Sequence, residues 1–340
     1  MRISCSASRT VPALVSALLL SACASTLPLP DPPTADAITT ETEHQRSEAL
    51  VRQHAREYRL ARVARPLLIA AARDLCPVQQ RSDYGLRLHS IASYAPSRRD
   101  AARTLYTLDR QPMLRTPVPG SPAARAGLRA GDRLLRLQGR SIEDMDTVDE
   151  TLHAVSGPLN LELARGDAFI VVKLWPDTLC DWPIRLSRSS VINAYADGQQ
   201  VRVTQAMLAY AQEDNELALV IAHELAHNGL QHIDKQLQNL LLGALLDLLA
   251  LTQGYPSPGI GATLGVHHRA LRWELEADLQ ALVLLHRAGY ALAPGVEFWR
   301  RLGTDFPASI RHTRGLSHPG TAERYLRMKA AAQALPNVPP

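Results

Sequence analysis

The stretch Glu216–His227 contains a His-Glu-Xaa-Xaa-His pattern and constrains the fold of this chain more than any other segment. Its apolar residues recur with a helical period, and on an α-helix residues four apart lie one turn above each other on the same face. His223 and His227 can therefore bind one Zn²⁺ through their imidazoles, at about 2.0–2.1 Å each. Glu224 lies about 100° around the helix, beside the metal, where a general base can take a proton from zinc-bound water. The stretch predicts a catalytic site with one Zn²⁺ per chain.

A second acidic block supports this interpretation. Residues 272–278 open another helical pattern, in which Glu274 and Asp278 share one face at a spacing of four residues. A catalytic zinc of the two-His, one-Glu type takes its carboxylate from elsewhere in the chain and keeps a fourth position for water. We predict that Glu274 is the third ligand and that Asp278 orients a ligand through a hydrogen bond. A solvated helix face is the alternative for this block, and we prefer it for Glu276.

An accidental match to the motif is the competing interpretation, because the chain has 12 histidines. The downstream carboxylates argue against it. A purely structural metal site is disfavoured, because structural zinc is closed by four Cys or His ligands. His232 would point about 140° away from His227 on a continuous helix, so we predict that it is structural or exposed.

Four sequence blocks follow one another across roughly residues 184–329: Asn193–Gly198, His223–His227, Glu274–Asp278 and Ser317–Pro319, the last followed by Arg324. Their order and spacing resemble the HtpX-like and CAAX-prenyl-protease-like gluzincin metallopeptidases, in particular a periplasmic lipoprotein branch with a PDZ-like domain. The resemblance implies a zinc metallopeptidase domain over residues 181–335, mainly helical with a small edge sheet. It also implies that Glu274 is the third zinc ligand and that His318 can reach the metal as a fourth ligand or latch.

The resemblance also implies a substrate-binding strand, and the residues after it suggest further roles. In gluzincins an edge strand beside the active-site helix pairs with the substrate backbone, which corresponds here to Asn193, Ala194 and Tyr195. Arg324 has three candidate roles: pairing with a carboxylate, contact with the tetrahedral oxyanion, or a surface salt bridge. His318 is a second candidate for contact with the oxyanion.

The first 22 residues are typical of a bacterial lipoprotein signal peptide. A positively charged beginning precedes the apolar run Val11–Leu20, which is too short to span a bilayer. Leu20–Cys23 resembles a lipobox, which implies cleavage before Cys23 and lipidation of that residue; an ordinary secretory signal is the alternative. Because Ala24 resembles the outer-membrane pattern of lipoproteins, we expect a lipid anchor in the bacterial outer membrane, facing the periplasm.

Two segments follow the signal peptide. Residues 23–42 are Pro-rich and predict an extended tether between the anchor and the folded body. Residues 43–80 carry helical periodicity, which Pro66 is expected to break or kink.

The cysteines agree with an exported protein. Cys5 leaves with the signal peptide and Cys23 is lipidated, so Cys76 and Cys180 remain. An even pair in an oxidising compartment predicts a disulfide, and two buried free thiols are the alternative.

Residues 81–180 predict a β-rich domain. The run Gly120–Gly139 has the order of a turn, a short helix, a tight turn and a strand, and it resembles the bacterial PDZ pattern. Leu159–Leu163 and Phe169–Leu174 alternate around a turn and predict a hairpin. A PDZ domain binds an extended C-terminal peptide as an added strand, and Gly85–Leu88 occupies the place of the loop that holds the peptide carboxylate. The alternative is a degenerate module that only packs against the peptidase.

The sequence therefore predicts an α+β protein, with a β-rich PDZ-like domain before a mainly helical zinc peptidase domain. The formal net charge is +4, and no basic block indicates nucleic acid binding. We expect polypeptide substrates, and the family resemblance implies misfolded or unassembled envelope proteins. A C-terminal peptide or an envelope protein is the expected partner of the PDZ-like domain. The competing hypothesis is a latched, weakly proteolytic assembly or quality-control factor that binds clients through this domain.

Overall fold

The computed structural model describes residues 30–155, 157–232, 260–307 and 321–335. Cys23 and His318 lie outside these residues, as do the predicted lipidation and latch contacts. The chain divides into two compact units, residues 1–42 and 43–340. None of the described helices combines the length and the apolar character that a membrane span requires.

The described part of the first unit contains the beginning of helix α1 (Ala35–Asp74). The prediction of an extended tether over residues 23–42 is therefore wrong for the residues from Ala35 onward. The last proline of the tether comes before Thr34, whose hydroxyl accepts a hydrogen bond from the Ala37 amide at 3.2 Å and caps the helix.

Of the break or kink predicted at Pro66, the break is absent. Helix α1 continues through this residue to Asp74, although proline removes a backbone hydrogen bond and costs about 3 kcal/mol in a helix interior. Val63 and Leu67, on either side of the proline, are fully buried. Burial of such side chains contributes about 1.5–3 kcal/mol each, which is enough to offset that cost.

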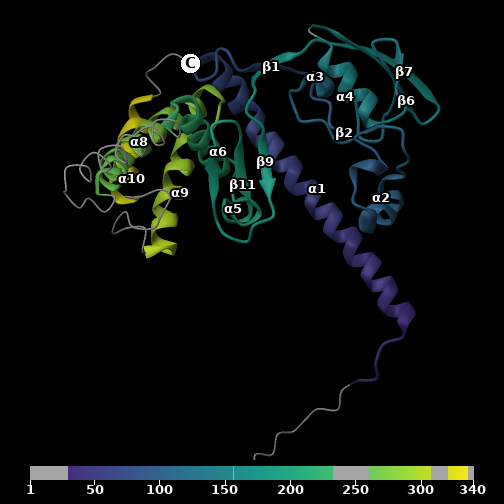
Figure 1. Ribbon diagram of the computed structural model, residues 1–340, viewed down its shortest axis with the longest axis horizontal. Helices are drawn as coiled ribbons and strands as arrows, with labels where there is room; N and C mark the ends of the chain where they lie inside the picture. The colour runs from purple at the N-terminus through teal and green to yellow at the C-terminus, as the bar shows by residue number, and fades with distance from the viewer. Residues whose placement is uncertain (1–29, 156, 233–259, 308–320, 336–340) are drawn as a thin grey trace, which may run out of the picture. The chain divides into compact units, whose positions relative to one another are not determined.

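A six-stranded sheet forms the centre of the predicted β-rich domain, with strand order β2-β3-β4-β6-β7 and with β5 paired to β4 (Figure 1). The predicted hairpin is confirmed, because β6 and β7 pair antiparallel along their whole lengths. The core of the domain contains the buried leucines Leu134, Leu137, Leu161 and Leu163. The elements are β2 Leu88–His89, η1 Ile91–Ser93, η2 Pro96–Arg98, α2 Arg99–Tyr106, β3 Met113–Leu114, α3 Pro122–Arg125, β4 Arg133–Leu137, β5 Arg140–Ser141, α4 Met145–His153, β6 Leu159–Arg165 and β7 Ala168–Leu174.

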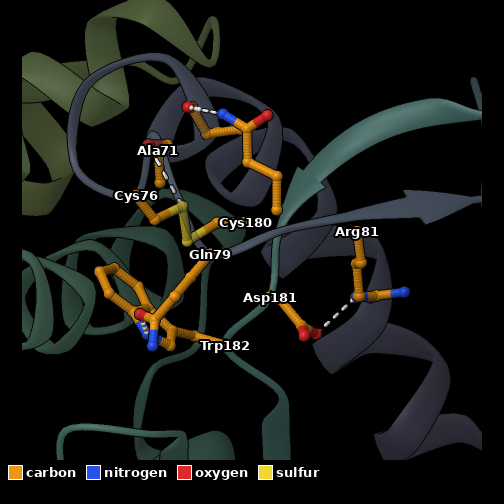
Figure 2. Close-up of a disulfide and its surroundings, with 9 residues drawn as sticks. Ala71, Cys76, Gln79, Arg81, Cys180, Asp181 and Trp182 are labelled. Carbon is orange, nitrogen blue, oxygen red and sulfur yellow. Dashed lines mark hydrogen bonds and ion pairs between the residues drawn. A yellow bond between two sulfur atoms is a disulfide. The ribbon is translucent and has the colours of Figure 1, made fainter.

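The two ends of this domain meet in a short antiparallel ladder of β1 (Gln80–Asp83) and β8 (Asp177–Cys180). Beside the ladder a disulfide joins Cys76 and Cys180, whose Cα atoms lie 5.8 Å apart (Figure 2). Both cysteines belong to a buried cluster that also contains Trp182. The bridge therefore ties the entry and the exit of the β-rich domain together inside the protein core.

The remaining elements are mainly helical and surround a three-stranded sheet of order β10-β11-β9. Strand β10 runs antiparallel to β11, whereas β9 runs parallel to it. Helix α6 packs against α8, α9 and the strands β10 and β11 (Figure 1). The elements are β9 Ile184–Ser187, β10 Ala194–Ala196, β11 Val201–Thr204, α5 Gln205–Tyr210, α6 Asp214–Gly229, α8 Ile260–Arg287, α9 Leu292–Asp305 and α10 Thr321–Ala334.

Helix α6 is buried along almost its whole length because its sequence is apolar on every side except at the motif. A capping box of Glu213 and Glu216 begins the helix and satisfies its first amides. Arg301 of α9 pairs with the Glu216 carboxylate at 2.6 Å, so this buried acid is compensated.

Helix α1 belongs to the core of the helical part. Leu60, Val63 and Leu67 join side chains of α6, α8 and α9 in one buried cluster. Arg59 of α1 also pairs with Asp214, the first residue of α6, at 3.1 Å. The predicted α+β class, with a β-rich domain before a mainly helical one, is confirmed.

Candidate metal centre

Helix α6 directs both motif histidines toward one point. His223 and His227 are buried one turn apart, and their Nε2 atoms lie 3.0 Å from each other. Helix α8 brings Glu274 to the same place: its Oε2 lies 3.3 Å from His223 Nε2 and its Oε1 lies 3.3 Å from His227 Nε2. Two nitrogens and one carboxylate therefore converge, as predicted from the spacing of the two blocks.

The donor set and its distances fit a catalytic zinc ion. Two ligand atoms at about 2.05 Å from a tetrahedral zinc lie about 3.3 Å apart, close to the three separations given above. The ligand atoms of His223, His227 and Glu274 all lie within 4.8 Å of one another. Two imidazoles and one carboxylate are the ligands of hydrolytic zinc, which leaves a fourth position for water.

A buried ion pair lies behind His223. Its Nδ1 is 3.0 Å from Asp278 Oδ1, on the side of the ring away from the convergence point. Arg324 of α10 donates two hydrogen bonds of 2.7 Å to the Asp278 carboxylate, and its Nη1 lies 3.1 Å from Glu274 Oε2. The Trp299 ring lies 4.1 Å from the guanidinium carbon. Three roles were predicted for Arg324, and the structure agrees with the first, pairing with a carboxylate. The complete burial of Arg324 contradicts a surface salt bridge.

These charges make the two histidines inequivalent. Burial alone would lower the pKa of His223, but its contacts with Asp278 and Glu274 outweigh burial and raise this pKa to about 9. Burial lowers the pKa of His227, against the opposing charges of Glu274 and Glu224. Burial would raise the pKa of Asp278, yet the Arg324 guanidinium and His223 hold it below its usual value.

Glu224 is buried on α6, directly after His223 in the chain. Against the effect of burial, the charges of Asp278, Glu274 and Glu224 together raise the pKa of Arg324. Glu224 therefore lies within electrostatic reach of the centre without belonging to the group of converging ligand atoms. The role of Glu224 as the general base stays a prediction from the sequence.

The predicted substrate strand lies at an edge of the small sheet. Ala194 and Tyr195 belong to β10, which pairs on one side with β11. Asn193 precedes the strand and accepts a hydrogen bond from the Thr204 amide through its carbonyl at 3.0 Å. Among the residues that the structure describes, one edge of β10 has no strand beside it, and β10 packs beside α6.

A residue that the sequence did not single out ties this strand to the motif helix. Asn228, the neighbour of His227, accepts a hydrogen bond from the Gly198 amide at 2.8 Å. Its amide nitrogen donates to the Gln200 carbonyl at 3.3 Å. Both partners lie in the turn between β10 and β11, so Asn228 fixes the hairpin relative to α6.

The sequence also missed the surroundings of His232. This side chain is buried, not exposed, and its Nδ1 lies 3.1 Å from the Nδ1 of His227. The expectation that it points away assumed a continuous helix, but α6 ends at Gly229 and Gln231 has a φ of +55°. The left-handed residue turns the chain back toward the motif. Trp299 was missed as well, because nothing in its sequence context marks it as a neighbour of Arg324.

Family comparisons agree with this geometry. Residues 175–332 match the model of peptidase family M48, and residues 114–165 match a PDZ domain. This chain contains an M48 peptidase domain. The M48 match spans α6, α8 and the centre formed by His223, His227 and Glu274. The predicted resemblance to a gluzincin peptidase with a PDZ-like domain is confirmed.

One curated relative is named "Putative beta-barrel assembly-enhancing protease" and comes from Vibrio cholerae serotype O1 (strain ATCC 39315 / El Tor Inaba N16961). It is 27% identical over 165 residues, which cover 44% of this chain and 34% of the relative. The alignment thus spans about a third of the length of that protein.

Solved structures resemble parts of the chain. The HtrA3 PDZ domain bound to a phage-derived ligand is 24% identical, with a TM-score of 0.25, and covers 29% of this chain and 89% of that one. The photosystem II D1 C-terminal processing protease is 21% identical, with a TM-score of 0.22, and covers 33% of this chain and 26% of that one. Similarities of this size carry no functional argument.

Proposed function

We propose that this protein is a zinc-dependent endopeptidase. The observation that carries the proposal is the convergence of His223 Nε2, His227 Nε2 and the Glu274 carboxylate, at separations of 3.0–3.3 Å. The match to peptidase family M48 supports the same conclusion. Glu224 stands next to the ligands on the same helix and supplies the base that hydrolysis requires.

The mechanism assigns one task to each residue. His223, His227 and Glu274 would hold the ion, which would polarise the substrate carbonyl and lower the pKa of a bound water to about 7. Glu224 would act as the general base that takes a proton from the attacking water, and then as the acid that gives a proton to the leaving amine. Asp278 holds the ring of His223 in place through its carboxylate, which lies 3.0 Å from Nδ1.

Arg324 acts on the ligands and not on the substrate. Its Nε and Nη2 bind Asp278, and its Nη1 faces Glu274, so its donors point to the two carboxylates. We assign it the role of keeping Asp278 ionised and of orienting both acids. The role of His318 as a fourth ligand or latch is proposed from the family resemblance alone.

The substrate is proposed to be polypeptide, bound as an added strand along the outer edge of β10. Such binding reads the backbone, so selectivity among side chains would be loose. The PDZ domain offers a second place for a C-terminal peptide or an envelope protein. This domain also favours the alternative function, a latched quality-control factor that binds clients and cleaves rarely.

We place the protein in the bacterial cell envelope, lipid-anchored through Cys23 in the outer membrane and facing the periplasm. The lipobox-like segment Leu20–Cys23 and the apolar run before it support this location. The disulfide between Cys76 and Cys180 supports it too, because such bridges persist in oxidising compartments. Misfolded or unassembled envelope proteins are the proposed substrates, and the name of the Vibrio cholerae relative supports an envelope role.

The test is zinc content and cleavage of an unfolded protein, measured side by side for the full-length protein and for Glu224→Gln. Loss of the general base should reduce the rate about 10²–10⁴-fold while one zinc per chain is retained. Cleavage at the wild-type rate by Glu224→Gln would disprove the mechanism. One zinc with no cleavage by either protein would favour the latched factor, and no zinc in either would refute the metal centre.

A further inference from the structure

Each of the two motif imidazoles has one nitrogen at the convergence point and one directed away from it. The away-facing Nδ1 of His223 meets the carboxylate of Asp278 at 3.0 Å. The away-facing Nδ1 of His227 meets another imidazole, the Nδ1 of His232, at 3.1 Å. A carboxylate therefore orients one proposed ligand, whereas a histidine lies behind the other.

Hydrogen-bond chemistry fixes the direction of the second contact. A neutral imidazole that holds a metal through Nε2 carries its proton on Nδ1. His227 Nδ1–H is then the donor, and the Nδ1 of His232 is the acceptor. His232 in turn carries its own proton on Nε2, which lies 3.4 Å from Glu276 Oε2. The tautomers of both rings are mutually consistent along this path.

The surroundings of His232 hold it in this orientation. Its ring is only 3% exposed and lies nearly parallel to Trp273, with ring centroids 5.8 Å apart. Glu276, at the far end of the path, is fixed by Arg272 at 2.8 Å. The ending of α6 at Gly229 and the left-handed Gln231 bring the chain to this place.

We propose that His232 is a positioning residue of the metal centre, which fixes the tautomer and the ring plane of His227 and thereby sets zinc affinity. The inference rests on the proposed function, because it takes His227 to be a zinc ligand. Glu276 keeps the partly solvated position that the sequence predicts, with its side chain 39% exposed and paired with Arg272, while its carboxylate also faces His232. Outer partners of this kind typically change metal affinity 10–100-fold when they are removed.

The experiment compares three substitutions in the full-length, metal-free protein. His232→Phe keeps the ring that stacks on Trp273 but removes the acceptor at Nδ1. His232→Asn places its side-chain oxygen near the position of Nδ1 and so restores an acceptor. Asn228→Ala is the matched control, because it removes buried hydrogen bonds next to His227 but none to a ligand imidazole.

Zinc affinity is measured by competition with a chromophoric chelator, and ligand geometry by the visible spectrum of the Co²⁺-substituted protein. We expect His232→Phe to bind zinc 10–100-fold more weakly with an altered Co²⁺ spectrum, and His232→Asn and Asn228→Ala to stay within about threefold of wild type. Thermal unfolding of each metal-free protein shows that the variants are folded.

Two results would overturn the inference: wild-type zinc affinity in His232→Phe, or equal weakening in His232→Phe and His232→Asn. Both presuppose that the wild-type protein binds zinc. A wild-type protein without zinc affinity would instead refute the proposed function, so the two failures are distinguishable.

Discussion

Two histidine clusters in this protein have opposite electrostatic surroundings. In the acidic cluster, His223 and His227 lie against Glu274 and Asp278, and the carboxylates raise the pKa of His223 to about 9. In the tyrosine cluster, the hydroxyl of Tyr94 lies 2.6 Å from His89 Nδ1 and 3.0 Å from His54 Nε2. Burial and the positive charge of Arg115 lower the pKa of both His54 and His89 to about 4.

The difference shows that histidines alone do not make a metal site. The tyrosine cluster keeps its histidines neutral, yet its third partner is a phenol, and the nearby guanidinium of Arg115 repels a cation. The acidic cluster supplies a carboxylate as third ligand and a second one to orient a ring. The character of the third and fourth groups therefore decides what a pair of histidines can bind.

The largest expected effect comes from removing the cation that balances the acidic cluster. Arg324→Met leaves Asp278 buried without its bidentate partner, which should cost about 3–5 kcal/mol of the free energy of unfolding. Urea unfolding of the metal-free protein measures this loss. Arg103→Met is the control, because Arg103 pairs with Asp100 at the surface and its loss should stay within about 0.5 kcal/mol. Equal losses in both variants would mean that the buried pair adds no stability.

A metal titration tests the comparison of the two clusters directly. Glu274→Gln removes the charge of the proposed third ligand, and zinc affinity should fall more than about 100-fold, beyond the effect of an outer partner. His89→Gln, in the tyrosine cluster, should leave both affinity and stoichiometry unchanged. Competition with a chelator gives both quantities. Zinc lost from His89→Gln and kept by Glu274→Gln would reverse our assignment of the site.

The pH dependence of stability should have opposite signs in the two clusters. His54 and His89 bind a proton near pH 6.5 when unfolded but only near pH 4 when folded. The unfolded state then holds more protons between these values, so the free energy of unfolding falls as the pH falls from 6.5 towards 4. His223 in the metal-free protein has a raised pKa, so its contribution is complete below pH 6.5 and is lost as the pH rises through about 9.

Denaturant unfolding of the metal-free protein at several pH values separates the two contributions. A double variant, His54→Phe with His89→Phe, should flatten the acidic side of the profile. His223→Gln should flatten the alkaline side. An unchanged acidic side in the double variant would contradict the low pKa values of the tyrosine cluster.

The sequence predicted the residues that repeat on one helix face and missed those brought in by chain reversals. His223, His227, Glu274 and Asp278 follow from a spacing of four, which a helix converts into a shared face. The burial of His232 depends on where α6 ends, and helix ends are poorly specified by periodicity.

Long-range partners were equally hard to predict. Arg324 was identified from the family resemblance, but its bond to Asp278 joins α10 to α8 across 46 residues of sequence. The tyrosine cluster joins His54 of α1 to Tyr94, which follows β2 in the chain, and no local sequence pattern predicts this contact. The start of α1 at Ala35 was missed because the prolines before it led us to predict an extended segment over all of residues 23–42.

The packing of α1 has a consequence for the modular architecture of the chain. The M48 match begins at residue 175, yet the core of the helical part includes Leu60, Val63 and Leu67 of α1. A fragment cut at residue 175 would leave the apolar surface that α1 covers exposed to water. The chain leaves α1 for the β-rich domain and returns to the helical part beside the Cys76–Cys180 bridge. Contacts of His54 with Tyr94 and of Glu57 with Arg115 hold the β-rich domain against α1 as well, so this one helix packs on both parts of the chain.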